Sequence, residues 1–411
     1  MFDVHPLLIP YYCPRRGPAA HNRQLSRWIH VVNPWGAICA TKPTYTLKTL
    51  ARFIFIAPSW TMNRNEIWKS ETVTTYADPL PDRRAQLDGL RIIAMTGVLL
   101  VHFWVRDPLI EHVRVSLFFT VSGFIITLIL LKARDRAKRT VVVNFYIRRA
   151  LRLLPPLAVL LGVSIAFDLD GARSSAWWHV FQASNIYFSL NETWSPWVFA
   201  HLWSLNVLEQ FYVIWPIVIL LLSPRLRWIV VGALVVLPML LRGLVEDRWL
   251  FLLPMFAFDP IALGALLALA RDHRLVRAVL ANDAALAVAM IVILSPLLVA
   301  EVWGHSETYR VASNLSLVAI VAGAYHGYSG IIGRVLGHRS LEGLSQISYG
   351  AYVYHLMVWY FAVEMWPVLY LPGPITFALM TCATLICAVV SWHVIEKPIS
   401  RLKTRFPIHN G

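Results

Sequence analysis

The chain carries a series of apolar runs, each close to the roughly 20 residues that an α-helix needs to cross the hydrocarbon core of a bilayer. Runs of this length constrain the fold more than any other feature of the sequence. They predict an all-α, polytopic membrane protein with about ten transmembrane helices, over residues 87–105, 113–132, 150–168, 199–222, 228–245, 249–270, 284–301, 310–328, 346–366 and 374–395.

Composition and charge agree with this class. Hydrophobic residues make up 57% of the chain and charged residues only 15%, whereas a soluble domain has about 25% charged residues. The net charge of +14 could indicate nucleic acid, but the basic residues lie between the apolar runs, where orientation signals belong. We therefore predict a lipid bilayer, and no nucleic acid, as the partner of this charge.

The basic residues also predict the orientation in the membrane. Segments after even-numbered runs hold eighteen Lys and Arg residues, and segments after odd-numbered runs hold six. Positively charged loops stay in the cytoplasm, so both termini are expected there, in a multi-pass protein of the cell (inner) membrane. The connection between the third and fourth runs is the longest outside loop. Its tryptophans suit an interfacial belt, with stacking on a sugar ring as the alternative.

The chain divides into three parts. Residues 1–80 read as a poorly structured leader, or as a mis-assigned start with the true start near Met62. Residues 84–401 are the membrane domain, and residues 402–411 are a cytoplasmic tail. The four cysteines show no metal or redox spacing, so no metal is expected.

The stretch Gln86–Val105 holds the first candidate site. It places Arg91 and His102 eleven residues apart, which on a helix is roughly 16 Å of rise. The arginine can then sit at a membrane surface while the imidazole reaches deep into the bilayer, where ionisable groups are costly and often functional. A neutral imidazole can act as a general base. The alternative is a histidine that only hydrogen-bonds across helices.

Two further polar groups interrupt the apolar pattern. Arg148, Arg149 and Arg152 precede or enter the third run, and arginine forks suit phosphate groups; lipid headgroups are the alternative. In HLWSLNVLEQFYVIWP, the side chains of His201, Ser204 and Glu209 lie in one apolar run. The carboxylate there can orient a histidine or serve as an acid or base, or these groups can simply bond helices together.

Isolated polar residues complete the candidates. Asp259, Tyr349, Tyr352 and His355 fall in apolar runs, and each alone is more often structural. Ser122 is read as a packing serine beside a glycine, since small residues let helices approach.

Together these stretches resemble the acyltransferase-3 family of bacterial membrane O-acyltransferases. The resemblance covers residues 84 to about 401 and rests on seven motifs in order, LDGLR…H, LFFTVSGFIIT, FYIRRALRLLPP, HLWSLNVLEQFY, FDPIALGALLA, ISYGAYVYH and EKPISR. It implies a ten-helix domain that takes an acyl group, commonly acetyl, from coenzyme A in the cytoplasm. The acceptor would be a hydroxyl, usually on a cell-envelope glycan or an exported small molecule.

The resemblance also assigns residues. The family's arginine–histidine pair falls on Arg91 and His102, its R-x-x-R on Arg149 and Arg152, and its His-x-Trp-Ser segment on a set of three, His201, Trp203 and Ser204. We expect the four arginines Arg91, Arg148, Arg149 and Arg152 to bind the phosphates of acetyl-CoA or another acyl-CoA. The catalytic residues would be His102, Glu209 and His201, with support or substrate contact from Trp203, Ser204, Asp259, Tyr349 and His355.

The chain departs from the family at two places. The family usually reads V-E-x-Q-F-Y, whereas here Leu208 takes the place of the carboxylate and Glu209 follows it, about 100° further around the helix. Arg114 and Ser116 stand where the family often has Gly and Asp.

The expected function is therefore transfer of an acyl group from coenzyme A to a carbohydrate or glycolipid hydroxyl, with His102 as general base or as the carrier of an acyl-histidine. Two other functions stay open on the sequence. Polar residues on membrane helices also mark the substrate path of a transporter or flippase, and the Leu208 departure leaves room for a membrane scaffold with a degenerate site.

Overall fold

The computed structural model describes residues 81–408 except 246, 248, 275, 281 and 298–305, with side chains from residue 85 onward except those of 279 and 280. The predicted leader and the proposed start at Met62 lie outside the described residues. Within the described residues every regular element is a helix, which confirms the all-α prediction. The elements are α2 (Pro81–Phe103), α3 (Pro108–Lys132), α4 (Lys138–Ala166), α5 (Ala176–Val180), α6 (Ser184–Asn191), α7 (Leu202–Leu221), α8 (Pro224–Leu244), α9 (Pro254–Ala257), α10 (Asp259–Ala270), α11 (Asp283–Leu294), α13 (Glu307–His326), α14 (Gly330–Leu336), α15 (Arg339–Met365), α16 (Pro374–Ser391) and α17 (Lys397–Ser400).

Six helices among the described residues are long and apolar enough to cross a membrane, or seven if the bent pair α13 and α14 is one span. The chain is thus a multi-pass membrane protein. The six are Ala85–Phe103, Pro108–Lys132, Lys138–Ala166, Leu202–Leu221, Pro224–Leu244 and Pro374–Arg405.

This number of membrane-length helices is lower than the predicted ten, because some apolar runs are broken into short helices and one long helix carries many polar side chains. The run 249–270 is divided because new helices begin at Pro254 and Asp259, as expected where proline takes the first helical turn. The resulting α10 has 12 residues, as does α11. The 27-residue helix α15 is long enough, but its tyrosines and other polar side chains lower its mean hydropathy.

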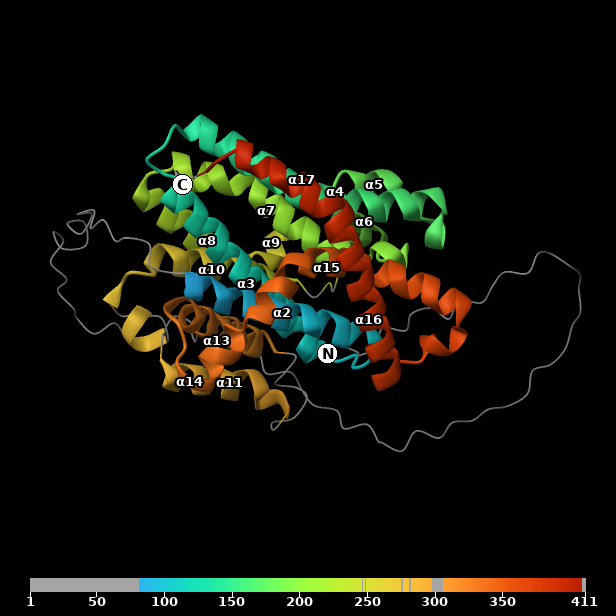
Figure 1. The fold of residues 1–411 in the computed structure, drawn as a ribbon. Helices are drawn as coiled ribbons and strands as arrows, with labels where there is room; N and C mark the ends of the chain where they lie inside the picture. The colour runs from blue at the N-terminus through green and yellow to red at the C-terminus, as the bar shows by residue number, and fades with distance from the viewer. Residues whose placement is uncertain are drawn as a thin grey trace, which may run out of the picture. The chain divides into compact units, whose positions relative to one another are not determined.

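Helix α2 lies among the other membrane helices, with α3, α13, α15 and α16 around it (Figure 1). Its buried face is apolar and includes Leu90, Ala94, Val98 and Leu99. Its neighbours come from both halves of the chain, so any polar residue on α2 meets side chains that are remote in sequence.

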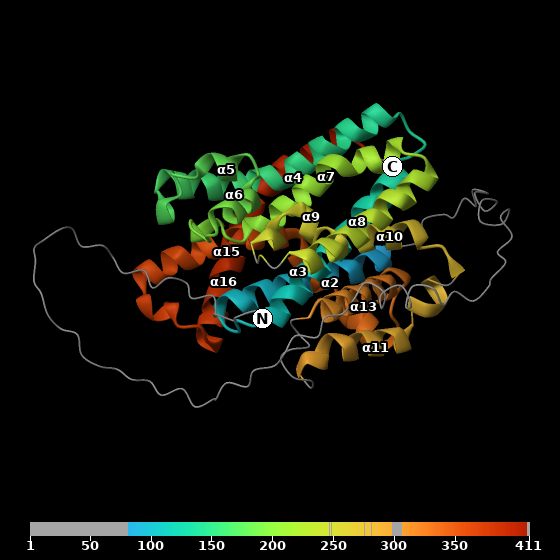
Figure 2. The same ribbon diagram turned by 180° about the vertical axis from the view of Figure 1, so that it is seen from behind.

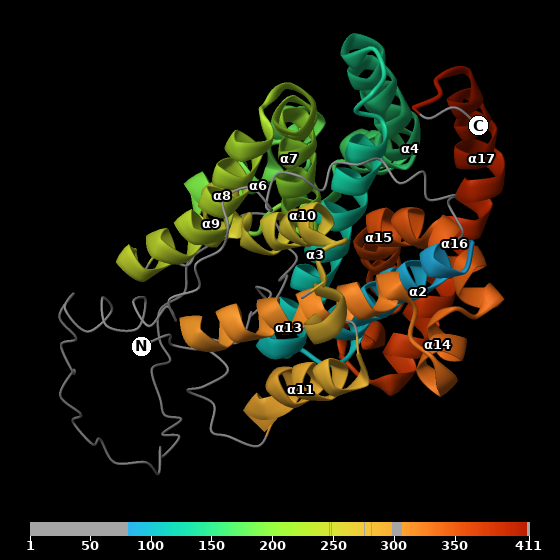
Figure 3. The same ribbon diagram turned by 90° about the vertical axis from the view of Figure 1, so that its left-hand side faces the viewer.

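The tightest helix contact joins α3 and α10, which lie side by side (Figure 3). A Cβ atom at Gly123 would lie 2.0 Å from the carbonyl oxygen of Ile261, and one at Gly264 would lie 2.0 Å from that of Thr120. Only glycine allows the two backbones to approach this closely. Ser122 is buried beside this crossing, in agreement with its reading as a packing residue.

The tryptophan-rich connection between α4 and α7 folds into the short helices α5 and α6, which lie beside those two helices (Figure 2). The imidazole of His179 is fully buried between Ser175 and Ser184, with N–O distances of 3.0 and 2.9 Å. Burial lowers the pKa of His179 from 6.5 to about 4. This histidine therefore stays neutral and fixes the connection in place.

Candidate active site

Three histidines from separate helices form one cluster, in which His102 is partly exposed and the other two are buried. The ring centroid of His355, on α15, lies 4.8 Å from that of His102 on α2 and 4.8 Å from that of His201 at the start of α7. His355 and His201 are 0% and 4% exposed. The structure thus brings together two of the predicted catalytic residues with one that was expected only to support them. We call these three residues the histidine cluster.

The hydrogen bonds of the cluster fix which nitrogen of each ring carries the proton. A backbone carbonyl can only accept, so the nitrogen that meets it must donate. His102 Nδ1 donates to the oxygen of Val98 at 2.8 Å, His201 Nε2 to that of Val353 at 3.1 Å, and His355 Nδ1 to that of Tyr352.

The opposite nitrogen of each ring therefore carries a lone pair. His201 Nδ1 and His355 Nε2 are buried and have no hydrogen-bond partner among the described residues. A buried acceptor without a donor costs on the order of 1–3 kcal/mol, and such exceptions mark sites that await a ligand or take part in a reaction. The cluster is thus suited to accept protons from hydroxyl groups.

A cavity leads toward this cluster from the middle of the helices. We call it the central cavity; it encloses about 750 Å³ of empty space, counting its open parts. Nine of its eighteen lining residues are apolar, and the other nine are arginine, serine or tyrosine. The lining residues are Arg91, Ala94, Met95, Val98, Arg114, Val115, Phe118, Phe119, Arg149, Arg152, Leu153, Ser204, Leu205, Leu208, Tyr212, Ser348, Tyr349 and Tyr352.

A second hollow adjoins the central cavity and shares Arg91, Arg152 and Tyr349 with it. We call it the arginine cleft; it encloses about 680 Å³, again counting open space. Its lining is strongly polar and includes both signs of charge, namely Asp88, Arg91, Arg152, Glu342, Glu396 and Lys403 together with Leu151, Ser345, Gln346, Tyr349, Trp392 and Ser400. The two hollows therefore lie next to each other and share part of their walls.

Two arginines in the lining of these hollows have no anionic partner among the described residues. Among the described residues, neither Arg149 nor Arg152 forms an ion pair or a hydrogen bond, and both are only partly exposed. The Arg149 guanidinium lies over the ring of Tyr212 at 4.8 Å and that of Phe145 at 5.6 Å, which holds it by cation–π attraction. Arg91 has a carboxylate neighbour, Asp88, at 3.6 Å. Unpaired guanidinium groups in a cleft are suited to bind phosphates.

Arg148, which was grouped with these residues, behaves differently. Its Nη1 donates to the backbone oxygens of Lys403 at 2.8 Å and Phe406 at 3.3 Å. It does not line either hollow. The structure thus gives Arg148 the task of holding the C-terminal segment against α4.

Tyr352 and Ser204 separate the central cavity from the histidine cluster. Both line the cavity, and their hydroxyl oxygens are 2.8 Å apart. The Tyr352 hydroxyl also donates to the backbone oxygen of His201, and its ring packs on that of His201 with centroids 5.2 Å apart. The cavity therefore ends at side chains in direct contact with the cluster, while the three histidines themselves are not part of its lining.

Comparison with known proteins decides the family. A family model described as an acyltransferase domain, of the acyltransferase-3 type, matches residues 84–393, most of the chain. The chain belongs to the acyltransferase-3 family.

Named relatives of this acyltransferase-3 protein are O-acetyltransferases. It is 27% identical to a peptidoglycan O-acetyltransferase of Listeria monocytogenes over 77% of this chain and 55% of the relative. It is 28% identical to a putative peptidoglycan O-acetyltransferase of Bacillus subtilis over 76% and 54%, and 35% identical to a putative O-acetyltransferase of Staphylococcus aureus over 34% and 26%. The chain thus spans at most about half the length of these relatives. No solved structure matches it.

Leu208 and Glu209 differ in their relation to the central cavity. Leu208 lines the cavity and is 1% exposed. Glu209 is not among the lining residues, and its Oε1 atom is buried without a hydrogen-bond partner. The one-residue shift therefore turns the carboxylate away from the cavity wall.

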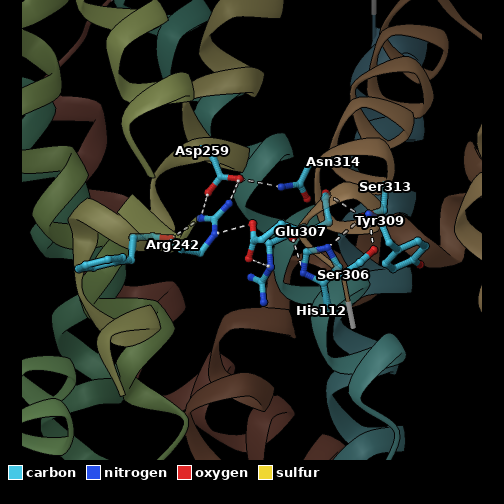
Figure 4. A network of polar contacts seen from close by, with 11 residues as sticks. His112, Arg242, Asp259, Ser306, Glu307, Tyr309, Ser313 and Asn314 are labelled. Atoms are coloured by element: carbon cyan, nitrogen blue, oxygen red, sulfur yellow. Dashed lines mark hydrogen bonds and ion pairs between the residues drawn. The ribbon is translucent and has the colours of Figure 1, made fainter. Parts of the chain in front are cut away.

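Trp203 and Asp259 lie apart from the histidine cluster. Trp203 packs against Phe119 and Phe251, with centroids 6.4 and 5.4 Å away. Asp259 is 2% exposed and accepts two hydrogen bonds from Arg242, at 2.9 and 3.1 Å (Figure 4).

The ion pair of Asp259 belongs to a network that joins α8, α10 and α13 (Figure 4). Asn314 donates to Asp259 at 2.9 Å, and Arg242 also donates to Glu307 at 3.1 Å. His112 on α3 meets Ser313 at 2.9 Å nearby. This arrangement satisfies a buried carboxylate and fastens helices together, which is a structural role.

One residue of the site had no predicted role. Arg114 on α3 is 7% exposed, lines the central cavity and lies within electrostatic range of all three clustered histidines. The only signal in the sequence was its departure from the family pattern. Among the described residues, no group of three or more His, Cys, Asp or Glu is placed to hold a metal ion.

Proposed function

We propose that this acyltransferase-3 protein moves an acyl group, acetyl in the simplest case, from coenzyme A to a hydroxyl of a cell-surface glycan or related acceptor. The observation that carries the proposal is the pair of adjacent hollows. The arginines Arg91, Arg149 and Arg152 line these hollows, and Tyr352, also in the lining, packs on the histidine cluster, in which the free nitrogens of His201 and His355 are buried. The first group suits a polyphosphate, and the second suits a hydroxyl.

The arginines support the proposal of an acyl-CoA donor. Arg91 and Arg152 at the arginine cleft, with Arg149 in the adjoining central cavity, would bind the phosphates, since charge-assisted hydrogen bonds from guanidinium to phosphate are strong. The apolar walls of the central cavity, such as Met95, Phe118 and Leu205, would accept the uncharged pantetheine arm. Arg148 takes no part, because its guanidinium is occupied by backbone carbonyls.

The chemistry falls to His102. Its Nδ1 proton is held by the carbonyl oxygen of Val98, which leaves Nε2 free to take the proton of the acceptor hydroxyl as a general base. The hydroxyl oxygen then forms an ester bond to the acyl carbon while the carbon–sulfur bond breaks, and the proton passes to the sulfur. His201 and His355, with their own free lone pairs, would hold the acceptor hydroxyl or water beside His102.

The names of the relatives and the predicted membrane topology support a proposal for the acceptor. Two relatives are named as peptidoglycan O-acetyltransferases, so we propose a carbohydrate or glycolipid outside the inner membrane. The distribution of basic residues predicts both termini in the cytoplasm, so α2 would start on the inner side, with Arg91 toward the donor pool. His102, eleven residues further along α2, would then lie toward the outer side and the acceptor.

The test uses purified protein in detergent micelles with acetyl-CoA labelled in the acetyl group and a soluble sugar acceptor. The proposal expects label on the acceptor and release of free thiol in equal amount. A transporter or flippase needs two compartments, so it would release no thiol in micelles and would move glycan only in sealed vesicles. That second outcome would replace the proposed function.

A further inference from the structure

Arg114 is a buried cation in the lining of the central cavity, and its charge acts on the histidine cluster. It is 7% exposed, and a Cβ atom on Gly97 of α2 would lie 3.0 Å from its Cβ atom. Glycine at this position therefore lets the arginine stem pack directly against α2. A charged group that is packed this tightly and lines a cavity needs partners for its N–H groups.

Only one edge of this guanidinium has a partner. Its Nε and Nη2 atoms both donate to a single oxygen of Glu111, with an Nε–O distance of 3.1 Å. No partner is recorded for Nη1 among the described residues. Glu111 orients the arginine and balances part of its charge, so the remaining N–H groups point in one fixed direction. A fixed guanidinium edge is suited to bind a carboxylate or phosphate.

The position of Arg114 places any ligand of it next to the reacting atoms. Its charge acts on His102, His201 and His355 alike, and it shares the cavity wall with Ser204 and Tyr352. The arginine cleft is the site proposed above for the phosphates of an acyl-CoA, and Arg114 is not part of its lining. The free edge of Arg114 is therefore available to a different anionic group.

We propose that Arg114 makes this enzyme selective for a substrate that carries a carboxylate or similar anion beside the reacting centre. Two sources share this chemistry. The anion belongs either to the acceptor, as in a uronic acid residue, or to the acyl group, as in a dicarboxylic acyl-CoA. The selectivity in transfer rests on the proposed function, whereas the binding of the anion does not.

The experiment compares the unaltered protein with Arg114→Gln and Arg114→Lys in four donor–acceptor pairs. The donors are acetyl-CoA and succinyl-CoA, and the acceptors are a neutral hexose trisaccharide and a uronic acid trisaccharide. Arg106→Gln is the matched control, since Arg106 also acts on His102 but is exposed and does not line the cavity.

We expect one of the two anionic sources to raise kcat/KM about 10- to 100-fold over the neutral pair, the range for a hydrogen bond between charged groups. Arg114→Gln would lower kcat/KM more for the preferred anionic pair than for the neutral pair, so that the preference is lost. Arg114→Lys would keep part of the preference, and Arg106→Gln would leave it intact. Equal loss in all four pairs for Arg114→Gln, or no preference in the unaltered protein, would overturn the proposal.

A binding measurement separates this result from the proposed function. If the unaltered protein transfers no acyl group in any pair, the proposed function fails. The thermal unfolding midpoint then tests the anion site by itself. The site is supported if the uronic acid trisaccharide raises the midpoint more than the neutral trisaccharide does, or succinyl-CoA more than acetyl-CoA, and if this difference is lost in Arg114→Gln. No such difference refutes it.

Discussion

Replacing Arg152 by glutamine should weaken donor binding without destabilising the protein. Arg152 has no anionic partner among the described residues and lies in a field of other arginines, Arg91 and Arg149. Its loss breaks no ion pair inside the protein and relieves repulsion, so the unfolding midpoint without donor should stay the same or rise. A hydrogen bond to a charged group is worth about 1.5–3 kcal/mol, which predicts a 10- to 100-fold increase in KM for acetyl-CoA.

The matched control is Arg148→Gln, four residues earlier on the same helix. The Arg148 guanidinium donates to the carbonyl oxygens of Lys403 and Phe406, so its loss should cost about 1–3 kcal/mol of stability and leave KM unchanged. Both variants are assayed in micelles by thiol release over a range of acetyl-CoA and by thermal unfolding. A KM that rises as much for Arg148→Gln as for Arg152→Gln would refute the assignment of the donor site.

Three predictions concern the scaffold and are read as unfolding midpoints in micelles. Asp259→Asn breaks the buried pair with Arg242 and should cost about 3–5 kcal/mol; a midpoint unchanged from that of the unaltered protein would contradict the structural role. Gly264→Ala places a Cβ atom 2.0 Å from the Thr120 oxygen and should cost about 1–3 kcal/mol by overpacking, whereas an unaffected midpoint would show that the helices do not cross there. Because the folded pKa of His179 is depressed from 6.5 to about 4, the unfolded chain binds a proton first as pH falls through this window. The free energy of unfolding should then drop by up to about 3 kcal/mol. This dependence on pH should weaken in His179→Gln, and its full persistence in that variant would show that the assignment is wrong.

The features that the sequence predicts well are those contained in one helix. Arg91 and His102 lie on α2 as their spacing required, and the apolar run that holds them is a membrane-length helix. Arg149 and Arg152, three residues apart on one face, both line the central cavity. Local periodicity is enough for such statements, because it depends only on the geometry of one helix.

What the sequence could not predict depends on how helices pack. His355 meets His102 only because α15 lies against α2, and nothing in either run indicates that pairing. Arg148 follows the same motif as Arg149 but points about 100° away around the helix, toward the C-terminal segment. The run 249–270 reads as one span by composition, although helices restart at Pro254 and Asp259.

The most direct test of the account is the rate of acyl transfer by His102→Gln. We expect kcat to fall by about 10²- to 10⁴-fold, the usual contribution of a general base, while acetyl-CoA still raises the unfolding midpoint as it does for the unaltered protein. Such a result would place His102 in the chemical step and not in donor binding. Transfer by His102→Gln at the unaltered rate, with the protein inserted and folded, would contradict the central claim that this imidazole takes the acceptor's proton.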